Sequence, residues 1–284
     1  MPKNRHPKTK AKIKAEKEKR KGVTLFLAIV LLGISLLTYF AYTLITNPSK
    51  PSLIEPDWQL NPSAQFKAAI IDHLSLTFPN TTFVETAADL LVSANYTVDY
   101  FSGEKVTVEF YRSLPTRNYN IIILRVHSAL REGTTFLALF TSEPYSSDKY
   151  FYEQLKNRVG RVRYHAGGDT YFGISHEFIL SDMKGKFQNT TIIMMGCKGL
   201  EYTPIAEAFI SKGAKAYIGW NASISASRTD TATTRLLHYL IKEKQTIKQA
   251  IENTMKDVGP DPTDNSTLLY YPASAGKEKI EAIP

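Results

Sequence analysis

Two residues that could carry out nucleophilic catalysis stand at the ends of two apolar runs. Cys197, the only cysteine in the chain, follows the apolar run 190–195 after a single glycine. His127 directly follows another apolar run, 121–126. A thiolate is a nucleophile, and a nearby imidazole can lower the pKa of the thiol or act as its base. We therefore predict a Cys–His pair, provided that the fold brings the two residues together.

Continuous apolar runs of this kind are typical of strands that are covered on both faces of a parallel sheet. The carboxyl ends of parallel strands meet at one edge of the sheet, where sites form in open α/β folds. If the two runs are neighbouring strands, the thiol and the imidazole face one another at that edge. Gly196 would let the backbone approach a substrate closely. The backbone amides of Cys197 and Ser128 would then be available to stabilise an oxyanion.

The rest of the sequence alternates between strand-like and helix-like segments. We expect strands at 66–71, 121–126, 136–140, 190–197, 216–220 and 268–271, helices at 81–94, 204–212, 229–243 and 246–258, and hairpins at 96–111 and 161–174. This alternation predicts an α/β class, a layered sandwich with a mostly parallel sheet.

The basic character of the chain is confined to its first residues. Residues 1–21 hold ten Lys and Arg against two Glu, a net charge of +8, which is also the net charge of the whole chain. The remainder therefore carries equal numbers of acidic and basic residues. The folded part has no charge support for nucleic-acid binding, and no nucleic-acid partner is expected.

Residues 23–45 form an uncharged stretch rich in Leu, Ile, Phe and Val. As a helix this stretch would span roughly 35 Å, enough to cross a bilayer with some tilt. The apolar core of a cleaved signal peptide is shorter, about 7–15 residues. We predict an uncleaved transmembrane helix over 23–46, with the basic tail 1–22 in the cytoplasm. A linker over 47–63 and one α/β domain over 64–284 would then lie outside the cell membrane.

Other sequence features fit an extracytoplasmic domain. Five Asn-X-Ser/Thr patterns occur beyond residue 47, although such short patterns also arise by chance. A single cysteine excludes a disulfide within the chain, and by itself it would also fit a small buried apolar residue. The basic tail can be explained as a topology determinant that contacts anionic lipid.

Together, the two blocks that end in His127-Ser128 and Gly196-Cys197 resemble the clan CD cysteine peptidases, which include caspases, legumain, clostripain, gingipains and separase. The segment 205–220 is similar to the helix, glycine turn and strand that follow the cysteine in gingipain-type and separase-related domains. The resemblance covers residues 64–275. It implies a caspase-like three-layer α/β/α sandwich and a Cys–His dyad that cleaves a protein or peptide substrate. Cys197 would be the nucleophile and His127 the general base and acid.

The chain departs from the family pattern at two places. Glycine usually follows the histidine, whereas this chain has Ser128, whose amide can still donate but whose Cβ crowds the site. Some relatives have an acidic residue just beyond the tryptophan of the following strand, where it binds a basic side chain of the substrate. Here Trp220 is followed by Asn221 and by no acid up to residue 225. Trp220 and Asn221 are candidates for the substrate pocket, but Trp220 would equally fit a core position.

Alternatives to a peptidase remain open at this stage. The domain could be a catalytically silent caspase-like module that binds a peptide or an envelope partner, or an unrelated α/β sensor. His165 and His176 are expected to be exposed loop histidines, and Asp72-His73 a turn or cap after the first strand. The spacing of His and Cys reproduces no zinc site, and the sequence has neither a phosphate-binding glycine loop nor a serine nucleophile elbow. We expect no metal and no cofactor.

Overall fold

The computed structural model describes residues 30–36, 38–39, 64–130 and 136–280. The chain divides into two compact units, Met1–Glu55 and Pro56–Pro284. In the first unit, residues 30–36 and 38–39 are helical. Most of the predicted transmembrane helix 23–46 lies outside the described residues, as do the whole tail 1–22 and the whole linker 47–63. Within the described ranges, no helix is both long enough and apolar enough to cross a membrane.

A six-stranded, mostly parallel sheet, sheet A, forms the centre of the second unit. Its strand order is β10-β9-β8-β3-β1-β2, and all neighbouring strands are parallel except the pair β9 and β10. The strands are β1 Phe66–Asp72, β2 Tyr96–Ser102, β3 Ile121–Arg125, β8 Thr190–Met194, β9 Ala214–Trp220 and β10 Leu268–Tyr271. The α/β class and the mostly parallel sheet are confirmed.

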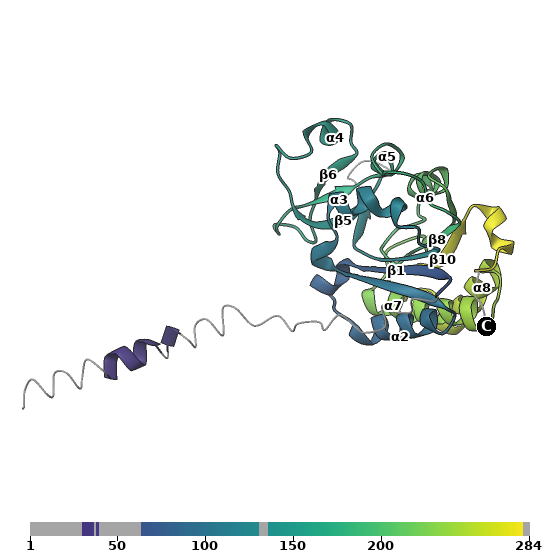
Figure 1. The fold of residues 1–284 in the computed structure, drawn as a ribbon, viewed down its shortest axis with the longest axis horizontal. Helices are drawn as coiled ribbons and strands as arrows, with labels where there is room; N and C mark the ends of the chain where they lie inside the picture. Colours follow the sequence, from purple (N-terminus) through teal and green to yellow (C-terminus); the bar gives the residue numbers. More distant parts are fainter. Residues whose placement is uncertain (1–29, 37, 40–63, 131–135, 281–284) are drawn as a thin grey trace, which may run out of the picture. The chain divides into compact units, whose positions relative to one another are not determined.

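Helices cover both faces of sheet A, as Figure 1 shows. One face packs against α2, α7 and α8, and the other against α3, α5 and α6. These helices are α2 Thr81–Val92, α3 Val108–Ser113, α5 His176–Ser181, α6 Pro204–Ser211, α7 Ala226–Leu237 and α8 Ile247–Val258. A π-helical turn His238–Lys242 extends α7, and 3₁₀ turns occur at His73–Leu76, Gly103–Lys105, Leu114–Arg117 and Ala273–Lys277.

The strand β3 shows why the apolar runs are continuous. All five of its residues are buried. Ile121 and Ile123 enter the core on the α2–α7–α8 face, whereas Ile122 and Leu124 enter the core on the opposite face. Side chains of a strand alternate between faces, so a strand between two helical layers must be apolar on both.

A second, antiparallel sheet, sheet B, is inserted between β3 and β8 in the sequence. Its order is β4-β5-β7-β6, with β4 Ser128–Leu130, β5 Leu137–Pro144, β6 Val159–Val162 and β7 Tyr171–Ile174. The short helix α4 Phe151–Leu155 precedes β6. The predicted hairpin over 161–174 is confirmed, with a first strand that begins two residues earlier than expected.

The predicted hairpin over 96–111 is wrong. Residues 96–102 form the edge strand β2, which pairs in parallel with β1, and residues 108–113 form the helix α3. Thr107 caps this helix by accepting a hydrogen bond from the Phe110 amide at 3.1 Å. Buried and partly exposed residues alternate along β2 because one face of this edge strand is less covered. The six residues of α3 are too few for their pattern to distinguish a strand from a short helix.

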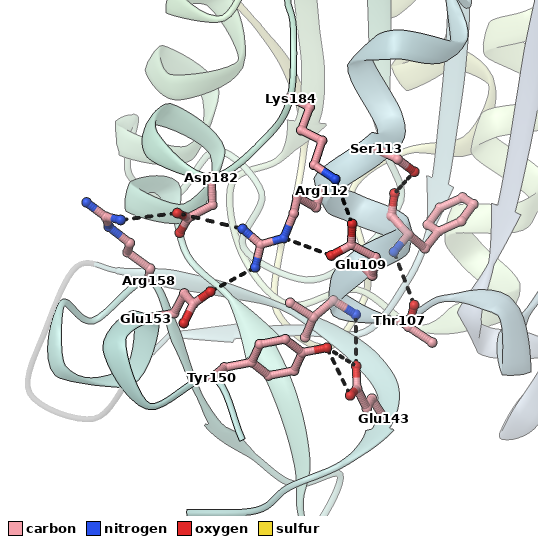
Figure 2. A network of polar contacts seen from close by, with 12 residues as sticks. Thr107, Glu109, Arg112, Ser113, Glu143, Tyr150, Glu153, Arg158, Asp182 and Lys184 are labelled. Atoms are coloured by element: carbon pink, nitrogen blue, oxygen red, sulfur yellow. Dashed lines mark hydrogen bonds and ion pairs between the residues drawn. The ribbon is translucent and has the colours of Figure 1, made fainter. Parts of the chain in front are cut away.

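A polar network around Arg112 attaches the lobe carrying α4 to α3 (Figure 2). Its guanidinium binds Glu109 at 2.9 Å, Glu153 of α4 at 2.9 Å and Asp182 at 3.8 Å. Asp182 also binds Arg158 at 3.1 Å, just before β6. The network therefore ties both ends of the segment 153–158 to sheet A's helical layer.

Candidate active site

The structure brings the two predicted catalytic residues to the same edge of sheet A. The strands β3 and β8 are parallel neighbours, with Leu124 in register with Met194. The Met195 amide donates to the Leu124 carbonyl at 2.9 Å, so the pairing continues past the end of β8. Beyond that point the Ser128 hydroxyl donates to the Cys197 carbonyl at 2.6 Å. The segments that carry His127 and Cys197 are therefore in direct contact.

Cys197 is half-buried, and its sulfur lies against the loop that follows β9. The Ile224 amide donates to Sγ, with the nitrogen 3.4 Å from the sulfur. The thiol in turn donates to the Ile224 carbonyl at 3.5 Å. The next residue, Lys198, has a left-handed backbone with φ of 62° and donates its amide to the Ala222 carbonyl at 2.8 Å. These hydrogen bonds fix the turn on which the thiol sits.

His127 lies within a group of aromatic side chains. Its Nε2 is 2.8 Å from the Thr77 Oγ1. Its ring lies 4.9 Å, centroid to centroid, from the ring of Tyr164, 5.9 Å from that of Phe140 and 6.0 Å from that of Phe78. Burial, together with the charge of the nearby Arg125, lowers the pKa of His127 to about 4. At neutral pH the imidazole is therefore uncharged, and the same shift makes it a weaker base than a solvated histidine.

The thiol and the imidazole each have their own hydrogen-bond partner. Among the described residues, no hydrogen bond joins Cys197 to His127. Catalytic hydrogen bonds are often long or absent before substrate binds, so this geometry is compatible with a dyad. In this state each member is held by a different loop, Thr77 holding the imidazole and Ile224 the sulfur.

The backbone amide of Ser128 is directed away from its own sheet. Ser128 is the register partner of Leu139, and the Phe140 amide donates to the His127 carbonyl at 3.0 Å. Hydrogen-bonded and non-hydrogen-bonded residue pairs alternate along an antiparallel ladder. The Ser128 amide therefore points away from β5, and because β4 is an edge strand, the ladder of sheet B does not use it.

Gly196 lies where two backbone segments approach closely. A Cβ at this position would collide with the Val126 carbonyl oxygen and lie 2.5 Å from both the Met194 methyl group and the Ser128 hydroxyl. Only glycine fits without a displacement of the neighbouring backbone. The absence of a side chain at Gly196 therefore allows the segments that follow β3 and β8 to approach one another.

The structure favours the core alternative for Trp220. Its side chain is fully buried, and its indole N–H donates to the Thr229 hydroxyl at 3.0 Å. That hydroxyl in turn donates to the Met195 carbonyl at 3.0 Å, two residues before Cys197. A fully buried side chain cannot line an open pocket, so the pocket prediction for Trp220 is wrong in this structure. Asn221 is half-buried, and its Oδ1 accepts from the Thr267 amide at 2.8 Å, which leaves its pocket role untested.

A second imidazole lies beside His127. The turn expected at Asp72-His73 is present, because Asp72 directly precedes the 3₁₀ turn His73–Leu76. In addition, the His73 side chain is fully buried and packs edge-on to His127, with ring centroids 5.8 Å apart. Its Nε2 is 3.0 Å from the Tyr164 hydroxyl. Burial and the neighbouring His127 lower the pKa of His73 to about 4. The sequence offers no sign of this cluster, because residues 73, 127 and 164 come from three distant segments.

The other histidines separate into two cases. His165 is exposed in the β6–β7 loop, as expected. His176 is buried at the start of α5, against the Phe136 ring at 4.6 Å, so the prediction of an exposed loop position is wrong there. Neither has a contact with Cys197 among the residues that the structure describes.

A buried arginine that the sequence analysis did not identify holds the segments next to the candidate site. Arg125 ends the apolar run of β3, and its fully buried side chain binds Asp72 and Asp230, each at 2.7 Å. It also donates to the Phe78 carbonyl at 2.8 Å. Asn80 donates to Asp230 at 2.8 Å from the same loop. The network therefore fixes the loop that presents Thr77 to His127. A charged residue inside an apolar run was the available clue, because such a charge must be paired when buried.

Comparison with protein-family models and with curated proteins finds no match. The functional conclusion therefore depends on the geometry of the site.

Proposed function

We propose that this chain is a cysteine peptidase with a caspase-like fold, in which Cys197 is the nucleophile and His127 the general base and acid. The observation that carries the proposal is the hydrogen bond from Ser128 to the Cys197 carbonyl. This bond joins the segment after β3 to the segment after β8, as the reaction requires.

Three further features support the proposal. The base is oriented by a third group, Thr77, which is the arrangement that activated nucleophiles share. The Ile224 backbone contacts the sulfur through its amide and its carbonyl and holds the thiol in place. The Ser128 amide points away from its own sheet and is free of the ladder, so it can donate to a substrate oxyanion.

In the proposed reaction, His127 accepts the thiol proton and the Cys197 sulfur attacks the carbonyl carbon of the substrate. The oxyanion receives the Ser128 amide, with a backbone amide of the Gly196-Cys197 turn as its second donor. His127 then gives the proton to the leaving amine, the amide bond breaks, and a thioester forms. Water, deprotonated by His127, hydrolyses the thioester and restores the thiol.

We also propose that residues 23–46 anchor the protein in the cell membrane with the tail 1–22 in the cytoplasm. The uncharged stretch 23–45 and the confinement of net positive charge to residues 1–21 support this orientation. The peptidase domain would then act outside the membrane on protein or peptide substrates.

The test is labelling of the full-length protein, purified in detergent, with a thiol-directed peptide electrophile. We expect the wild type to react, Cys197→Ala to be inert, and His127→Ala to react at least about tenfold more slowly, within the range that general-base catalysis contributes. His238→Ala is the matched control, because His238 is a surface residue after α7 that pairs with Glu243. It should label like the wild type.

Equal labelling of wild type and His127→Ala would overturn the dyad. Labelling without cleavage of any member of a diverse peptide library would instead favour the silent binding domain. The observation that favours a silent binding domain is that the thiol and the imidazole bind separate partners, Ile224 and Thr77.

A further inference from the structure

The short helix α4 turns its apolar side toward the solvent. Its apolar residues Phe151, Tyr152 and Leu155 are 55%, 80% and 63% exposed, and none of its five residues is buried. The two polar residues between them, Glu153 and Gln154, are the less exposed ones. A surface helix of a globular protein normally directs its apolar side to the core. We call the exposed apolar residues 151, 152 and 155 the α4 patch.

Polar contacts hold α4 in this orientation. Glu153 binds Arg112 of α3 at 2.9 Å, as Figure 2 shows. Gln154 donates to the Ser146 carbonyl at 2.9 Å and accepts a hydrogen bond from the Tyr145 hydroxyl at 2.9 Å. A rotation of the helix that buried its apolar side would break these contacts. The α4 patch is therefore a fixed part of the surface of the domain.

The side chains of the α4 patch are contiguous. The rings of Phe151 and Tyr152 lie edge to face, with their centroids 6.0 Å apart, and Leu155 follows one helical turn after Phe151. Scattered single apolar residues are normal on a protein surface, whereas a contiguous apolar patch with a polar rim marks a surface that contacts a membrane or another protein. The charge around the patch distinguishes between these two partners.

Basic side chains predominate around the α4 patch. Residues 148–163 hold five Lys and Arg against two acidic residues, a net charge of +3 within a remainder of the chain that is neutral. Lys156, the residue after α4, is exposed, and the structure gives it no carboxylate partner within the described part of the chain. Cations beside exposed aromatic and aliphatic side chains are typical of surfaces that lie on anionic lipid.

Arg161 of β6 adds a cation on the same face of sheet B as α4. It is the register partner of Phe172, so the two side chains lie on one face. The Phe172 ring packs against the rings of Tyr145 and Tyr150 at 5.2 and 5.1 Å, and Tyr150 directly precedes α4. The Arg161 guanidinium itself lies 5.8 Å from the Tyr145 ring. Arg161 and Lys156 therefore belong to the polar rim of the patch.

The length of the predicted linker allows any face of the domain to meet the bilayer. The linker 47–63 separates the predicted transmembrane helix from the first described residue of the domain. A chain of this length spans at most about 60 Å when extended. A globular domain of this size is about 45 Å across. The chemistry of the surface therefore decides which face rests on the membrane.

We propose that the α4 patch docks the domain on a lipid bilayer that contains anionic lipid. Phe151, Tyr152 and Leu155 enter the headgroup region, and Lys156 and Arg161 contact the anionic headgroups. Tyrosine suits this position, because its ring is apolar and its hydroxyl stays hydrated. The proposal goes beyond the peptidase function and rests on the proposed anchor only for bringing a bilayer close. Docking would hold the domain at one orientation over the membrane.

The test uses the full chain reconstituted in nanodiscs of phosphatidylcholine and phosphatidylglycerol. In a Cys197→Ala background, Ser147→Cys supplies a single thiol for an environment-sensitive dye, at an exposed position of the loop before α4. The readout is quenching of the dye by lipid that carries a spin label near its headgroup. We expect the quenching to be at least about threefold stronger with the intact patch than in the additional presence of Phe151→Ser,Leu155→Ser.

Three variants on the same dye-labelled background complete the test. Leu269→Ser removes an exposed apolar side chain from β10 and should leave the quenching unchanged. Lys156→Gln,Arg161→Gln should weaken the quenching about threefold in discs that contain phosphatidylglycerol, and should have no effect in discs of phosphatidylcholine alone. Arg235→Gln,Lys248→Gln is the matched control, because it removes two exposed cations from α7 and α8. It should change the quenching in neither kind of disc.

Equal quenching with the intact patch and with Phe151→Ser,Leu155→Ser would overturn the docking surface. A dimer in detergent that this double substitution dissociates, without patch-dependent quenching, would assign the patch to a second copy of the chain and also overturn it. A chain that enters the discs but shows no patch-dependent quenching refutes docking and leaves the anchor intact.

A chain that does not enter the discs refutes the anchor instead. Flotation of that chain with vesicles of the same lipids then decides the docking surface. Flotation that is lost in Phe151→Ser,Leu155→Ser retains it, and absence of flotation overturns it. None of these readouts uses the Cys197 thiol, so they are independent of whether the chain is a peptidase.

Discussion

Ser128 and Gly196 together determine how closely the two candidate catalytic segments approach. The Ser128 hydroxyl bridges to the Cys197 carbonyl, while the missing side chain at Gly196 makes room for the Val126 carbonyl and for that same hydroxyl. The serine that seemed to crowd the site thus holds the turn that carries the thiol. The departure from the family pattern at this position is compatible with an intact site.

Gly196→Ala should be destabilising, because its Cβ would collide with the Val126 carbonyl oxygen, a backbone atom that cannot rotate away. We expect a loss of about 1–3 kcal/mol in the free energy of unfolding, measured by urea denaturation of the unit Pro56–Pro284, which contains both hydrophobic cores. Gly160→Ala is the matched control, because no atom lies within 4 Å of a Cβ at that position. Similar stabilities for the two variants would contradict the steric argument.

Arg125→Leu should be more damaging still. The substitution leaves the carboxylates of Asp72 and Asp230 buried without their counter-charge. Breaking a buried pair by removing one partner costs about 3–5 kcal/mol, so the variant should unfold at much lower urea or fail to fold. Arg235→Leu on the exposed face of α7 should change stability by less than about 1 kcal/mol. The Arg125→Leu,Asp230→Leu double variant should recover part of the loss, and a simple sum of the two single effects would argue against coupling.

At the level of elements, the sequence predicts those strands and helices whose apolar residues follow a local periodicity. The strands β3 and β8 are buried on both faces and read as unbroken apolar runs, and α6 shows its inward residues Ile205, Ala208 and Phe209 at helical spacing. The order of these elements then places Cys197 and His127 at one edge. The candidate dyad was therefore within reach of sequence reasoning.

Features that depend on tertiary contacts were not predictable. A parallel edge strand such as β2 and one strand of a hairpin have the same alternation, and only the partner strand distinguishes them. The contacts of Tyr164 with His73 and His127 join the β6–β7 loop to the ends of β1 and β3, which no short motif connects.

The Arg112 network makes α4 and β6 a unit whose order depends on few contacts (Figure 2). Arg112→Met keeps an apolar stem near the Phe178 ring but removes three ion pairs. We expect faster amide hydrogen exchange over 150–160, with little change in sheet A. Lys184→Met is the matched control, because it removes only the exposed pair with Glu109. Equal acceleration in both variants, or acceleration spread evenly over sheet A, would contradict this role.

The whole molecule separates electrostatically into a strongly basic tail and a neutral remainder. Such a distribution localises attraction for anionic lipid to the N-terminal residues. The neutral remainder has no net charge that would steer a charged substrate, so charge-dependent recognition would depend on local groups.

The stability of the domain should fall as the pH falls from about 6.5 to 4. His73 has a pKa lowered to about 4 by burial and by His127, against an ordinary value of about 6.5 in the unfolded chain. The unfolded state therefore binds more protons in this window, and unfolding becomes more favourable as acid is added. From pH 7 to pH 5, His73 alone should remove about 2 kcal/mol from the free energy of unfolding of the unit Pro56–Pro284.

His73→Phe keeps a buried ring and removes the titration, so this variant should lose less stability over the same interval, whatever its stability at pH 7. His165→Phe is the control, because this histidine is exposed and should leave the pH dependence as it is in the wild type. An identical pH dependence in wild type and His73→Phe would show that His73 is not held in its neutral form by the fold.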